Sequence, residues 1–404
     1  LALMVGPRIE YAEVWEKKSD RRFILASERI TACFKDPEEY RIVRVFPGYE
    51  LEGKSYLPLF DFFADRCLQG CFRILLEESV SVEEGTGIVH AAPAFGEVDF
   101  YACQKAGIDP VCPVDQNGRF TEEVFPWKGM GIKEAEKEIL RSLKEKQLLF
   151  HHATCRHRYP FCPRSDTPLI YRTVCTWFVA VEKIKEQILQ VNDQVHWVPD
   201  HIQYGRFGKW LLGARDWAIS RNRYWGTPIP IWRSDDGELL VIGSLQELKE
   251  RSGQEVSDLH RHFLDEVEIV HQGKVFRRIP EVFDCWFESG SMPYAQNHYP
   301  FENKELFEKN FPAQFIAEGL DQTRGWFYTL TVLSTALFQK PAFQNVIVNG
   351  LILAADGAKM SKRLKNYPDP MDVVKQYGAD AVRLYMLHSP AVRAEDLAFS
   401  KQGV

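Results

Sequence analysis

Between residues 311 and 350 the sequence alternates between short apolar runs typical of β-strands and one long apolar run typical of a helix. Residues 314–317 and 345–350 are the strand-like runs, and residues 323–337 between them have helical length. This alternation predicts a parallel sheet of an α/β protein, because parallel strands need a crossover that is usually a helix. Active sites lie beyond the carboxyl ends of such strands, so the loops beginning at Glu318 and Gly350 should form the functional edge.

The first part of the chain, residues 1–165, predicts an α+β unit rich in strands. Residues 40–46 alternate like a strand, and residues 72–82 favour a hairpin whose arms are 72–76 and 79–82. Residues 85–92 indicate a buried strand that opens into a loop. Residues 133–146 have helical spacing, with opposite charges four residues apart.

The rest of the chain predicts helices on both sides of a small insert. Residues 177–191 are amphipathic at the helical period, and residues 206–212 favour another helix. A turn that begins at Ser234 opens the insert, which spans about 232–278. Further on, Asp369 and Pro370 should begin a helix that ends at Gly378, and residues 380–388 should form the next one.

The composition limits which cellular compartment and which binding partners the chain can have. Of the 404 residues, 26% are charged and the formal net charge is −6, which argues against a generally basic coat for nucleic acid but leaves a local basic groove open. The nine cysteines are irregularly spaced, which indicates a reducing, cytoplasmic compartment. No apolar run reaches the roughly 18 residues that span a bilayer, so we expect no membrane contact.

Three short blocks carry the candidate chemistry. Lys-Met-Ser-Lys-Arg at 359–363 places two lysines three residues apart after a Gly-Ala pair, and both can reach phosphate groups on which negative charge develops. The second block is Glu-Gly-Leu-Asp-Gln-Thr-Arg-Gly-Trp at 318–326. Its Asp321 and Gln322 offer hydrogen-bond partners for hydroxyl and ammonium groups, and Gly319 lets backbone approach a ligand closely. The third block, Asp-Cys-Trp-Phe-Glu-Ser-Gly, occupies 284–290.

With these blocks in this order, the chain resembles the isoleucyl-tRNA synthetases of class I, of the eukaryotic-like type, over essentially its whole length. The resemblance implies an α/β fold: the second half of a class I synthetase Rossmann-like nucleotide-binding domain with a large strand-rich α+β editing insertion. It assigns residues 1–165 to an N-terminally truncated editing (connective polypeptide) domain. Residues 166–368, with the insert and the lysine loop, become the second half of the catalytic domain, and residues 369–404 begin a helical stem-contact region.

The implied activity is ATP-dependent activation of isoleucine to isoleucyl-adenylate and its transfer to tRNA(Ile). By resemblance, Lys362 has the main role at the phosphates and Lys359 supports it. Trp286 and Trp326 resemble the aromatic walls of the pocket for the isoleucine side chain. The other residues that the resemblance places at ATP or the adenylate are Glu318, Gly319, Asp321, Gln322, Gly350, Leu351, Ile352, Met360 and Ser361.

A second, hydrolytic site is expected beside this activity. A hydrophobic pocket gains only about 1–3 kcal/mol from one methylene, a limit for which isoleucine and valine are themselves the reference pair. The segment Gly-Thr-Gly-Ile-Val-His-Ala-Ala-Pro-Ala-Phe-Gly-Glu-Val-Asp at 85–99 resembles the editing-domain signature. The resemblance matches Asp99 to the carboxylate that holds the α-ammonium group of a misattached amino acid, and it places Thr86 and His90 in the same pocket.

The resemblance also implies parts that the sequence does not contain. A Thr-rich editing peptide and a His-x-Gly-His motif should precede Leu1, and an anticodon-binding domain should follow Val404. We therefore expect an internal fragment that is inactive by itself. Its implied partners are ATP with Mg²⁺, isoleucine and tRNA(Ile), without DNA or a membrane.

A zinc site is the one metal hypothesis that the sequence raises. The candidate ligands are His151, His152, Cys155, His157 and Cys162. A structural zinc site usually contains Cys-x-x-Cys, and here the position three after Cys162 is Ser165. We therefore expect no bound metal other than the magnesium that accompanies ATP.

Several other functions compete with the ligase. A ligase for valine or leucine is opposed by the Trp286 and Trp326 blocks. A stand-alone hydrolase of misacylated tRNA should have lost the lysine motif, and a non-enzymatic RNA-binding or scaffold protein should have lost Asp99 or Asp321. A nucleotidyltransferase of the same fold would lack an editing insertion. Arg221 and Arg223, between two tryptophans, resemble a patch that stacks on RNA, but we expect a structural role first and contact with the tRNA acceptor second.

Overall fold

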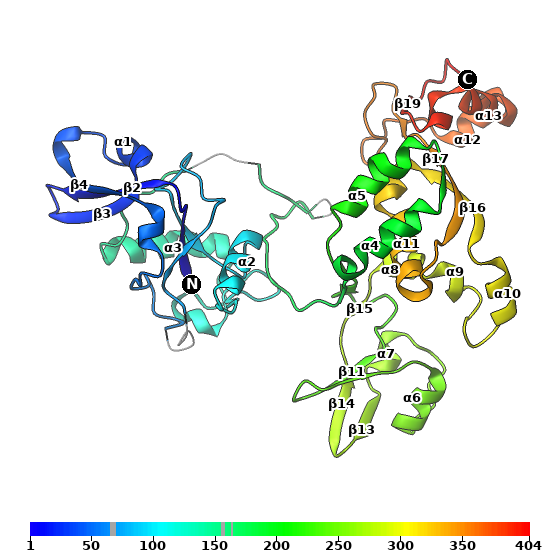
Figure 1. Ribbon diagram of the computed structural model, residues 1–404, viewed down its shortest axis with the longest axis horizontal. Helices are drawn as coiled ribbons and strands as arrows, with labels where there is room; N and C mark the ends of the chain where they lie inside the picture. The colour runs from blue at the N-terminus through cyan, green and yellow to red at the C-terminus, as the bar shows by residue number, and fades with distance from the viewer. Residues whose placement is uncertain (65–69, 155–157, 163–164) are drawn as a thin grey trace. The chain divides into compact units, whose positions relative to one another are not determined.

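The computed structural model describes residues 1–64, 70–154, 158–162 and 165–404. The chain divides into two compact units, Leu1–Cys175 and Thr176–Val404. Figure 1 shows the first unit in blue to green and the second in green to red. Each unit has hydrophobic clusters of its own, so each is described separately.

The described residues of the first unit form two small sheets. In the first sheet the opening strand β1 (Ala2–Val5) lies between β5 (Ile74–Leu76), to which it is parallel, and β6 (Ile88–Ala91), to which it is antiparallel. The second sheet is antiparallel, with β2 in the centre. Its strands are β2 (Glu10–Glu16), β3 (Arg21–Ala26) and β4 (Tyr40–Pro47), and the unit's helices are α1 (Ile30–Cys33), α2 (Glu97–Lys105) and α3 (Ile132–Glu145).

Two predictions for this unit are wrong. Residues 72–82 form no hairpin: residues 79–82 are not a strand, and Ile74 pairs instead with Leu3 of β1. The partner is distant in the sequence, so local alternation could not reveal it. The strand at 85–92 is present as β6 but is not a buried one: Val89 and His90 are exposed, and β6 has a neighbouring strand on one side only. The helix predicted at 133–146 is confirmed as α3, although its ion pairs are three residues apart rather than four.

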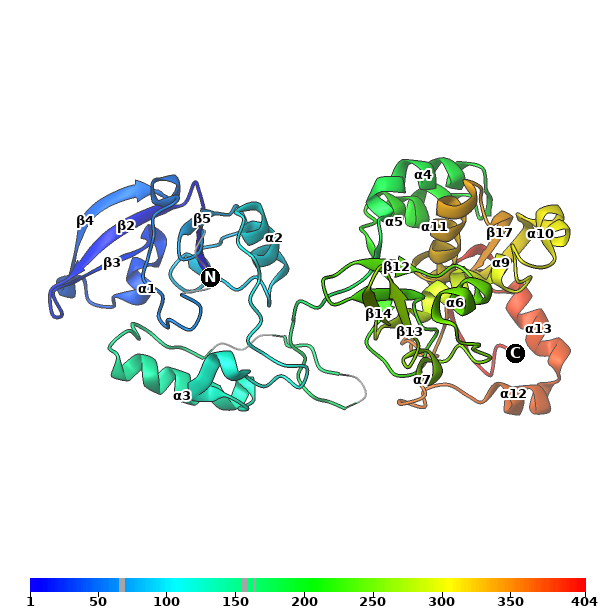
Figure 2. The same ribbon diagram turned by 90° about the horizontal axis from the view of Figure 1, so that it is seen from below.

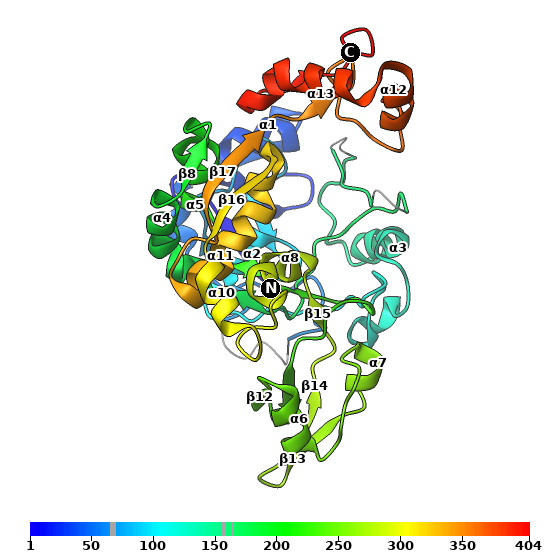
Figure 3. The same cartoon turned by 90° about the vertical axis from the view of Figure 1, so that its right-hand side faces the viewer.

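The second unit is built on a parallel sheet, as the alternation predicted. Its order is β16 (Ala313–Gly319), β17 (Phe343–Asn349) and β8 (His196–Val198). Figure 3 shows the three strands side by side. The helix α11 (Trp326–Phe338) connects β16 to β17 and buries most of its side chains.

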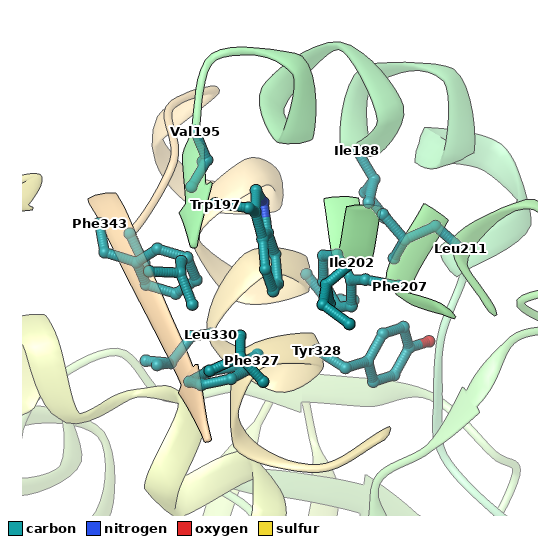
Figure 4. Packing of buried hydrophobic residues seen from close by; sticks show 14 of the residues in the cluster. Ile188, Val195, Trp197, Ile202, Phe207, Leu211, Phe327, Tyr328, Leu330 and Phe343 are labelled. Carbon is teal, nitrogen blue, oxygen red and sulfur yellow. The ribbon is translucent and has the colours of Figure 1, made fainter. Parts of the chain in front are cut away.

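The main core of this unit lies where α11, α4 (Lys185–Asp193) and α5 (Gly208–Leu212) meet the sheet. Trp197 of β8 is 1% exposed and packs its ring against Phe207 and Phe327 (Figure 4). Fully burying an aromatic side chain of this kind stabilises a fold by about 1.5–3 kcal/mol. The core therefore fixes the sheet and α11 to each other, and with them the loops that leave the strands.

Two expectations for this unit need correction. Residues 314–317 do form a strand but not a buried one, because β16 is an edge strand and Phe315 is 63% exposed. The helix predicted at 177–191 begins only at Lys185. Before it, β7 (Phe178–Val179) pairs with β9 (Trp217–Ala218), and Val181–Ile184 form a 3₁₀ turn. Pairing with a distant strand therefore overrode the helical period at the start of that run.

The small insert is an antiparallel sheet with its own core. The strand order is β12-β11-β14-β13, and Figure 2 labels β12, β13 and β14 together with α6. Trp232 and Phe276 are buried against Leu248 of α6. Its elements are β11 (Ile231–Ser234), β12 (Leu239–Val241), α6 (Leu245–Ser252), α7 (Arg261–Leu264), β13 (Glu268–His271) and β14 (Lys274–Arg278).

The last part of the chain forms two helices and returns to the sheet edge. The side chain of Asp369 caps α12 (Pro370–Tyr377) by accepting the N–H of Met371, and Gly378 ends this helix with φ +89°. Both helices agree with the prediction. The second is α13 (Ala379–His388), and the remaining elements of the unit are β10 (Ser220–Arg221), β15 (Val282–Phe283), α8 (Cys285–Gly290), α9 (Met292–Ala295), α10 (Lys304–Asn310), β18 (Ile352–Leu353) and β19 (Leu397–Ala398). None of the helices in the described ranges has the length and apolar character that crossing a membrane requires.

Candidate functional site

Two loops leave the same edge of the parallel sheet. Glu318 and Gly319 are the last residues of β16, and they lie beside Val348 and Asn349 at the end of β17. Gly350 follows β17 directly. The loops that start at Glu318 and Gly350 therefore lie next to each other at the carboxyl ends of the strands, where α/β sheets bind their ligands.

The loop after β16 is a short 3₁₀ turn, Leu320–Arg324, that leads into α11. A Cβ atom on Gly319 would lie 2.7 Å from Oδ1 of Asp321, so only glycine fits at that position without moving the carboxylate. Gln322 uses both ends of its amide: Oε1 accepts the N–H of Trp326 at 3.0 Å, and Nε2 donates to Oδ2 of Asp321 at 3.3 Å. Asp321 is exposed and keeps Oδ1 available for a ligand.

Arg206 and Trp210, whose roles the sequence did not indicate, hold this turn in place. Thr323 is completely buried; its hydroxyl donates to the carbonyl oxygen of Leu320 at 2.7 Å and accepts Nε–H of Arg206 at 3.0 Å. The guanidinium group of Arg324 lies 4.9 Å from the ring centre of Trp210 on α5. The turn is therefore fixed against α5 and the π-helical turn that precedes it. The sequence indicated a helix at 206–212 but not this contact, since its two sides lie more than a hundred residues apart.

The two predicted pocket tryptophans lie where α8 contacts the start of α11. Trp326 donates its indole N–H to the carbonyl oxygen of Ser289 at 2.9 Å. Trp286, 41% exposed, packs so closely on Gly325 that a Cβ atom there would lie 3.1 Å from its ring. A cavity of about 170 Å³ touches Trp326 but not Trp286, and its other walls include Ala313, Phe315 and Phe343. Those residues belong to the amino-terminal halves of β16 and β17, so this cavity is not at the ligand-binding edge.

Residues 350–353 after β17 are held by a later part of the chain. Gly350 donates its N–H to the carbonyl oxygen of Ala391 at 2.7 Å, and β18 pairs in parallel with β19. A Cβ atom on Gly350 would lie 1.7 Å from the carbonyl oxygen of Glu395. Leu351 and Ile352 are half-buried, with their backbone in this pairing.

Replacing Gly350 with alanine should therefore destabilise the second unit. The new methyl group must displace backbone atoms, and overpacking of that kind costs about 3 kcal/mol. Urea unfolding followed by circular dichroism should show a clearly lower midpoint than for the unchanged chain. Gly213→Ala is the matched control, because φ is −87° there and the nearest atom is 3.7 Å from the new Cβ. Equal midpoints for the two variants would contradict the close contact at Glu395.

The lysine loop follows β18 as an ordered turn. Ala354 donates to the carbonyl oxygen of Ala358 at 2.8 Å, and Gly357 adopts φ +78°, which favours glycine. The side chain of Asn366 closes the motif: it accepts the N–H of Ser361 at 2.9 Å and donates to the carbonyl oxygen of Lys359 at 3.1 Å. Sequence reasoning missed Asn366, whose role depends on the folded turn.

Both lysines of the motif are exposed. Within the described ranges, neither Lys359 nor Lys362 makes a side-chain hydrogen bond or an ion pair. Met360 and Ser361 between them are half-buried, and the hydroxyl of Ser361 accepts the N–H of Arg363 at 3.2 Å. The loop thus presents two uncompensated ammonium groups to solvent, an arrangement suited to binding an anion such as a polyphosphate.

In the first unit, Asp99 and His90 lie close to each other. Asp99 is in the first turn of α2, and its Oδ2 accepts the N–H of Ala92 at 2.9 Å, just beyond the end of β6. His90 borders a cavity of about 460 Å³ whose other walls are mainly apolar and aromatic. The large apolar and aromatic residues that line this cavity include Tyr56, Phe60, Phe72, Phe95, Ile139 and Leu143.

The imidazole of His90 favours its neutral form. Although part of the ring faces solvent, burial beside the apolar cavity lowers the pKa of His90. The carboxylate of Asp99 opposes this effect. A neutral histidine can accept or donate a proton at pH 7.

Thr86 is placed apart from this pair. It lies before the start of β6, where its carbonyl oxygen accepts the N–H of Ala26 at 2.8 Å, whereas Asp99 contacts the chain beyond the other end of the strand. The structure therefore brings His90 and Asp99 together and leaves Thr86 outside that arrangement.

The candidate zinc ligands are only partly within the described residues. Cys155 and His157 lie outside them, and His151 and His152 are exposed. In the ranges that the structure covers, no three His, Cys, Asp or Glu side chains are grouped so as to hold a metal ion.

Comparison with known proteins adds a family and several relatives. The model of the family described as tRNA synthetases class I (I, L, M and V) matches residues 9–398. An isoleucine–tRNA ligase of Protochlamydia amoebophila is 72% identical over all 404 residues, and those of Chlamydia trachomatis serovar L2 and Chlamydia pneumoniae are 61% and 59% identical. In each case the match covers 100% of this chain and 39% of the relative, so the chain spans about two fifths of the length of these proteins.

Two solved structures show a weaker likeness. One is a ternary complex of Agrobacterium radiobacter K84 agnB2 LeuRS with tRNA and LeuAMS, which covers 98% of this chain and 45% of that one, with 17% identity and a TM-score of 0.39. The other is the Mycobacterium tuberculosis methionyl-tRNA synthetase bound by methionyl-adenylate, which covers 60% of this chain and 39% of that one, with 18% identity and a TM-score of 0.38.

Proposed function

This chain belongs to the class I tRNA synthetases, and on that premise we propose that the protein it comes from is an isoleucine–tRNA ligase. The reaction is the ATP-dependent activation of isoleucine to isoleucyl-adenylate, followed by transfer to tRNA(Ile). The observation that carries the proposal is the 72% identity to a chlamydial isoleucine–tRNA ligase over every residue of this chain. Because the match covers 39% of that relative, the activity is assigned to the whole protein and not to this part alone.

The lysine loop supplies the phosphate chemistry in this proposal. Class I synthetases use ATP, and attack of the amino-acid carboxylate on the α-phosphate expels pyrophosphate. Negative charge grows on the phosphates, and cations already in place stabilise it more than mobile water could. Lys362 has the main role and Lys359 assists it; the hydrogen bonds of Asn366 to the backbone hold the loop that carries both lysines. Mg²⁺ would be held mainly by the phosphates and water.

The turn after β16 binds the other half of the adenylate. Glu318 and Asp321 carry negative charge at the strand ends, which suits the α-ammonium group of isoleucine and the ribose hydroxyls. Gln322 orients Asp321 and caps α11 at the same time. Gly350, Leu351 and Ile352 offer backbone groups to the adenine, and Trp286 with Trp326 forms the apolar wall for the isoleucine side chain.

The first unit hydrolyses valine attached in error. Asp99 holds the α-ammonium group of the misattached residue through Oδ1, since Oδ2 accepts the backbone N–H of Ala92. His90 stands at the mouth of an apolar cavity that accepts a small aliphatic side chain. Thr86 belongs to the same editing segment by resemblance. In this proposal residues 1–165 form the editing domain, residues 166–368 the catalytic half-domain and residues 369–404 the start of the stem-contact region, all in the cytoplasm.

Isoleucine-dependent ATP–pyrophosphate exchange by the full-length protein tests the proposal. We expect exchange with isoleucine at a kcat/KM roughly 10 to 200 times that with valine, the range that one methylene supplies in a hydrophobic pocket. Leucine should support almost no ATP–pyrophosphate exchange. Charging should require tRNA(Ile). If valine or leucine were the preferred substrate, the protein would be a different member of the class, and if no amino acid supported exchange, the ligase proposal would be wrong.

A further inference from the structure

Four aromatic rings form a row at the surface of the second unit. We call Trp225, His260, His262 and Phe263 the ring ladder. The ring centres of Trp225 and His260 are 4.5 Å apart with planes at 23°, those of His260 and His262 are 6.2 Å apart at 22°, and those of His262 and Phe263 are 4.3 Å apart at 41°. The ladder joins the loop before β11 to the start of α7, whose place in the unit Figure 1 shows.

The ladder ends in an open indole face. Trp225 is 69% exposed although His260 is stacked on it, so the face that points away from His260 meets solvent. Its neighbour Tyr224 and the last ring, Phe263, are exposed as well. Scattered exposed aromatics are ordinary, but a contiguous group of them marks a binding surface.

The rings are held in position by a hydrogen-bond network. Arg261 donates to the carbonyl oxygen of Arg223 at 3.0 Å and to Oδ2 of Asp265 at 2.8 Å. Asp265 in turn receives the guanidinium group of Arg278, which is buried at the base of the insert. On the ladder itself, Asp258 accepts the N–H of His260 at 2.8 Å and contacts its Nδ1 at 2.5 Å. The ring side chains are therefore fixed before a partner binds, so less conformational entropy is lost on binding.

The charge of Arg223 beside the ladder, unpaired within the described part of the chain, favours an anionic partner. Among the described residues, the Arg223 side chain has neither a hydrogen bond nor an ion pair, and Arg261 lies 5.7 Å from the ring centre of Tyr224. Arg261 is already paired with Asp265, so in the ranges that the structure describes Arg223 is the cation beside the rings that remains available. Proteins bind single-stranded nucleic acid with flat rings on which bases stack and cations that neutralise phosphates.

We propose that the ring ladder is a stacking platform for an unpaired base of an RNA strand, with Arg223 beside a backbone phosphate. An incoming base continues the row on the open face of Trp225. The inference rests on the proposed function, which makes tRNA the RNA in question. A protein surface is the other class of partner that could cover Trp225, and the test separates the two.

The test measures the Kd of the full-length protein for a fluorescein-labelled tRNA(Ile) transcript by anisotropy at several salt concentrations. Trp225→Ala should raise the Kd about tenfold, since one base–aromatic stack is lost, without changing the slope of log Kd against log salt. Trp225→Phe keeps a ring and should bind nearly as the unchanged protein does. Arg223→Gln should lower the magnitude of the slope by about 0.7, the value for one phosphate of a single strand.

Tyr204→Ala is the matched control, because Tyr204 is 65% exposed and lies on a different element of the same unit. It should leave the Kd unchanged. An unchanged Kd for Trp225→Ala, which is the result expected if a protein surface covers the ladder, or equal losses for Trp225→Ala and Tyr204→Ala, would overturn the proposal. Isoleucine-dependent exchange, measured in parallel, tests the proposed function separately, because it does not require tRNA contact at the ladder.

Discussion

Replacing Lys362 with alanine should lower the rate of isoleucine-dependent ATP–pyrophosphate exchange in the full-length protein by about 10²-fold or more. The loss of one preorganised group that stabilises developing charge has effects of this size. The affinity for isoleucine should change little, because the ammonium group of Lys362 acts on phosphate and not on the amino acid. Steady-state exchange at saturating ATP, with isoleucine varied, separates the two quantities.

Lys365→Ala is the control for this effect. Lys365 lies on the same loop, is exposed, and makes no side-chain hydrogen bond or ion pair in the described residues. It removes the same charge three residues away, so a general loss of positive charge would affect both variants alike. We expect only Lys362→Ala to lose the exchange rate substantially. Exchange that survived unchanged in Lys362→Ala would contradict the assigned role at the phosphates.

Replacing Asp99 with alanine should make the full-length protein accumulate valyl-tRNA(Ile) while activation of isoleucine continues. Without an anchor for the α-ammonium group, the misattached residue is no longer held for hydrolysis. The remaining discrimination is that of one methylene, so at equal concentrations valine should be attached at roughly 1/200 to 1/10 of the isoleucine rate, this pair being the reference case for that limit. Radiolabelled valine retained on tRNA over time is the measurement.

The hydrogen bond from Ala92 makes a second variant necessary. Asp99→Ala removes both the charge and the acceptor that joins α2 to the end of β6. Asp99→Asn keeps a carbonyl oxygen that can accept this N–H and removes only the charge. Loss of editing in both variants supports the anchoring role, whereas normal editing in Asp99→Asn would show that Asp99 acts through the fold. Unchanged fidelity in both would refute the assignment.

The architecture near the candidate active site was predictable because its signals are local. The strands β16 and β17 and the helix between them each have their own apolar pattern, and Asp369 with Pro370 begins a helix as their side chains dictate. The third strand of the sheet, β8, was not predicted. The placement of Glu318 and Gly350 on one edge then follows from the rule for parallel sheets. These steps need no knowledge of which distant residues meet.

The errors and omissions come from contacts between distant segments. The false hairpin at 72–82 arose because β5 pairs with β1, some seventy residues earlier. The exposed face of β16 depends on having one neighbouring strand, which no local pattern reports. Arg206 supports the turn through one hydrogen bond to Thr323, and Asn366 supports the lysine loop through two hydrogen bonds to the backbone of Lys359 and Ser361. The sequence around an arginine or asparagine does not show which distant residue its side chain will bond to.

The pairing of β18 with β19 limits how the chain can vary among relatives. Leu397 donates to the carbonyl oxygen of Leu351, and the carbonyl oxygen of Glu395 occupies the space that a side chain at position 350 would need. Insertions or deletions between residues 391 and 397 would shift this register and pull on the strand that leads into the lysine loop. Length changes should therefore collect in the helical segment 370–388, and the two paired stretches should keep a constant register to each other in evolution.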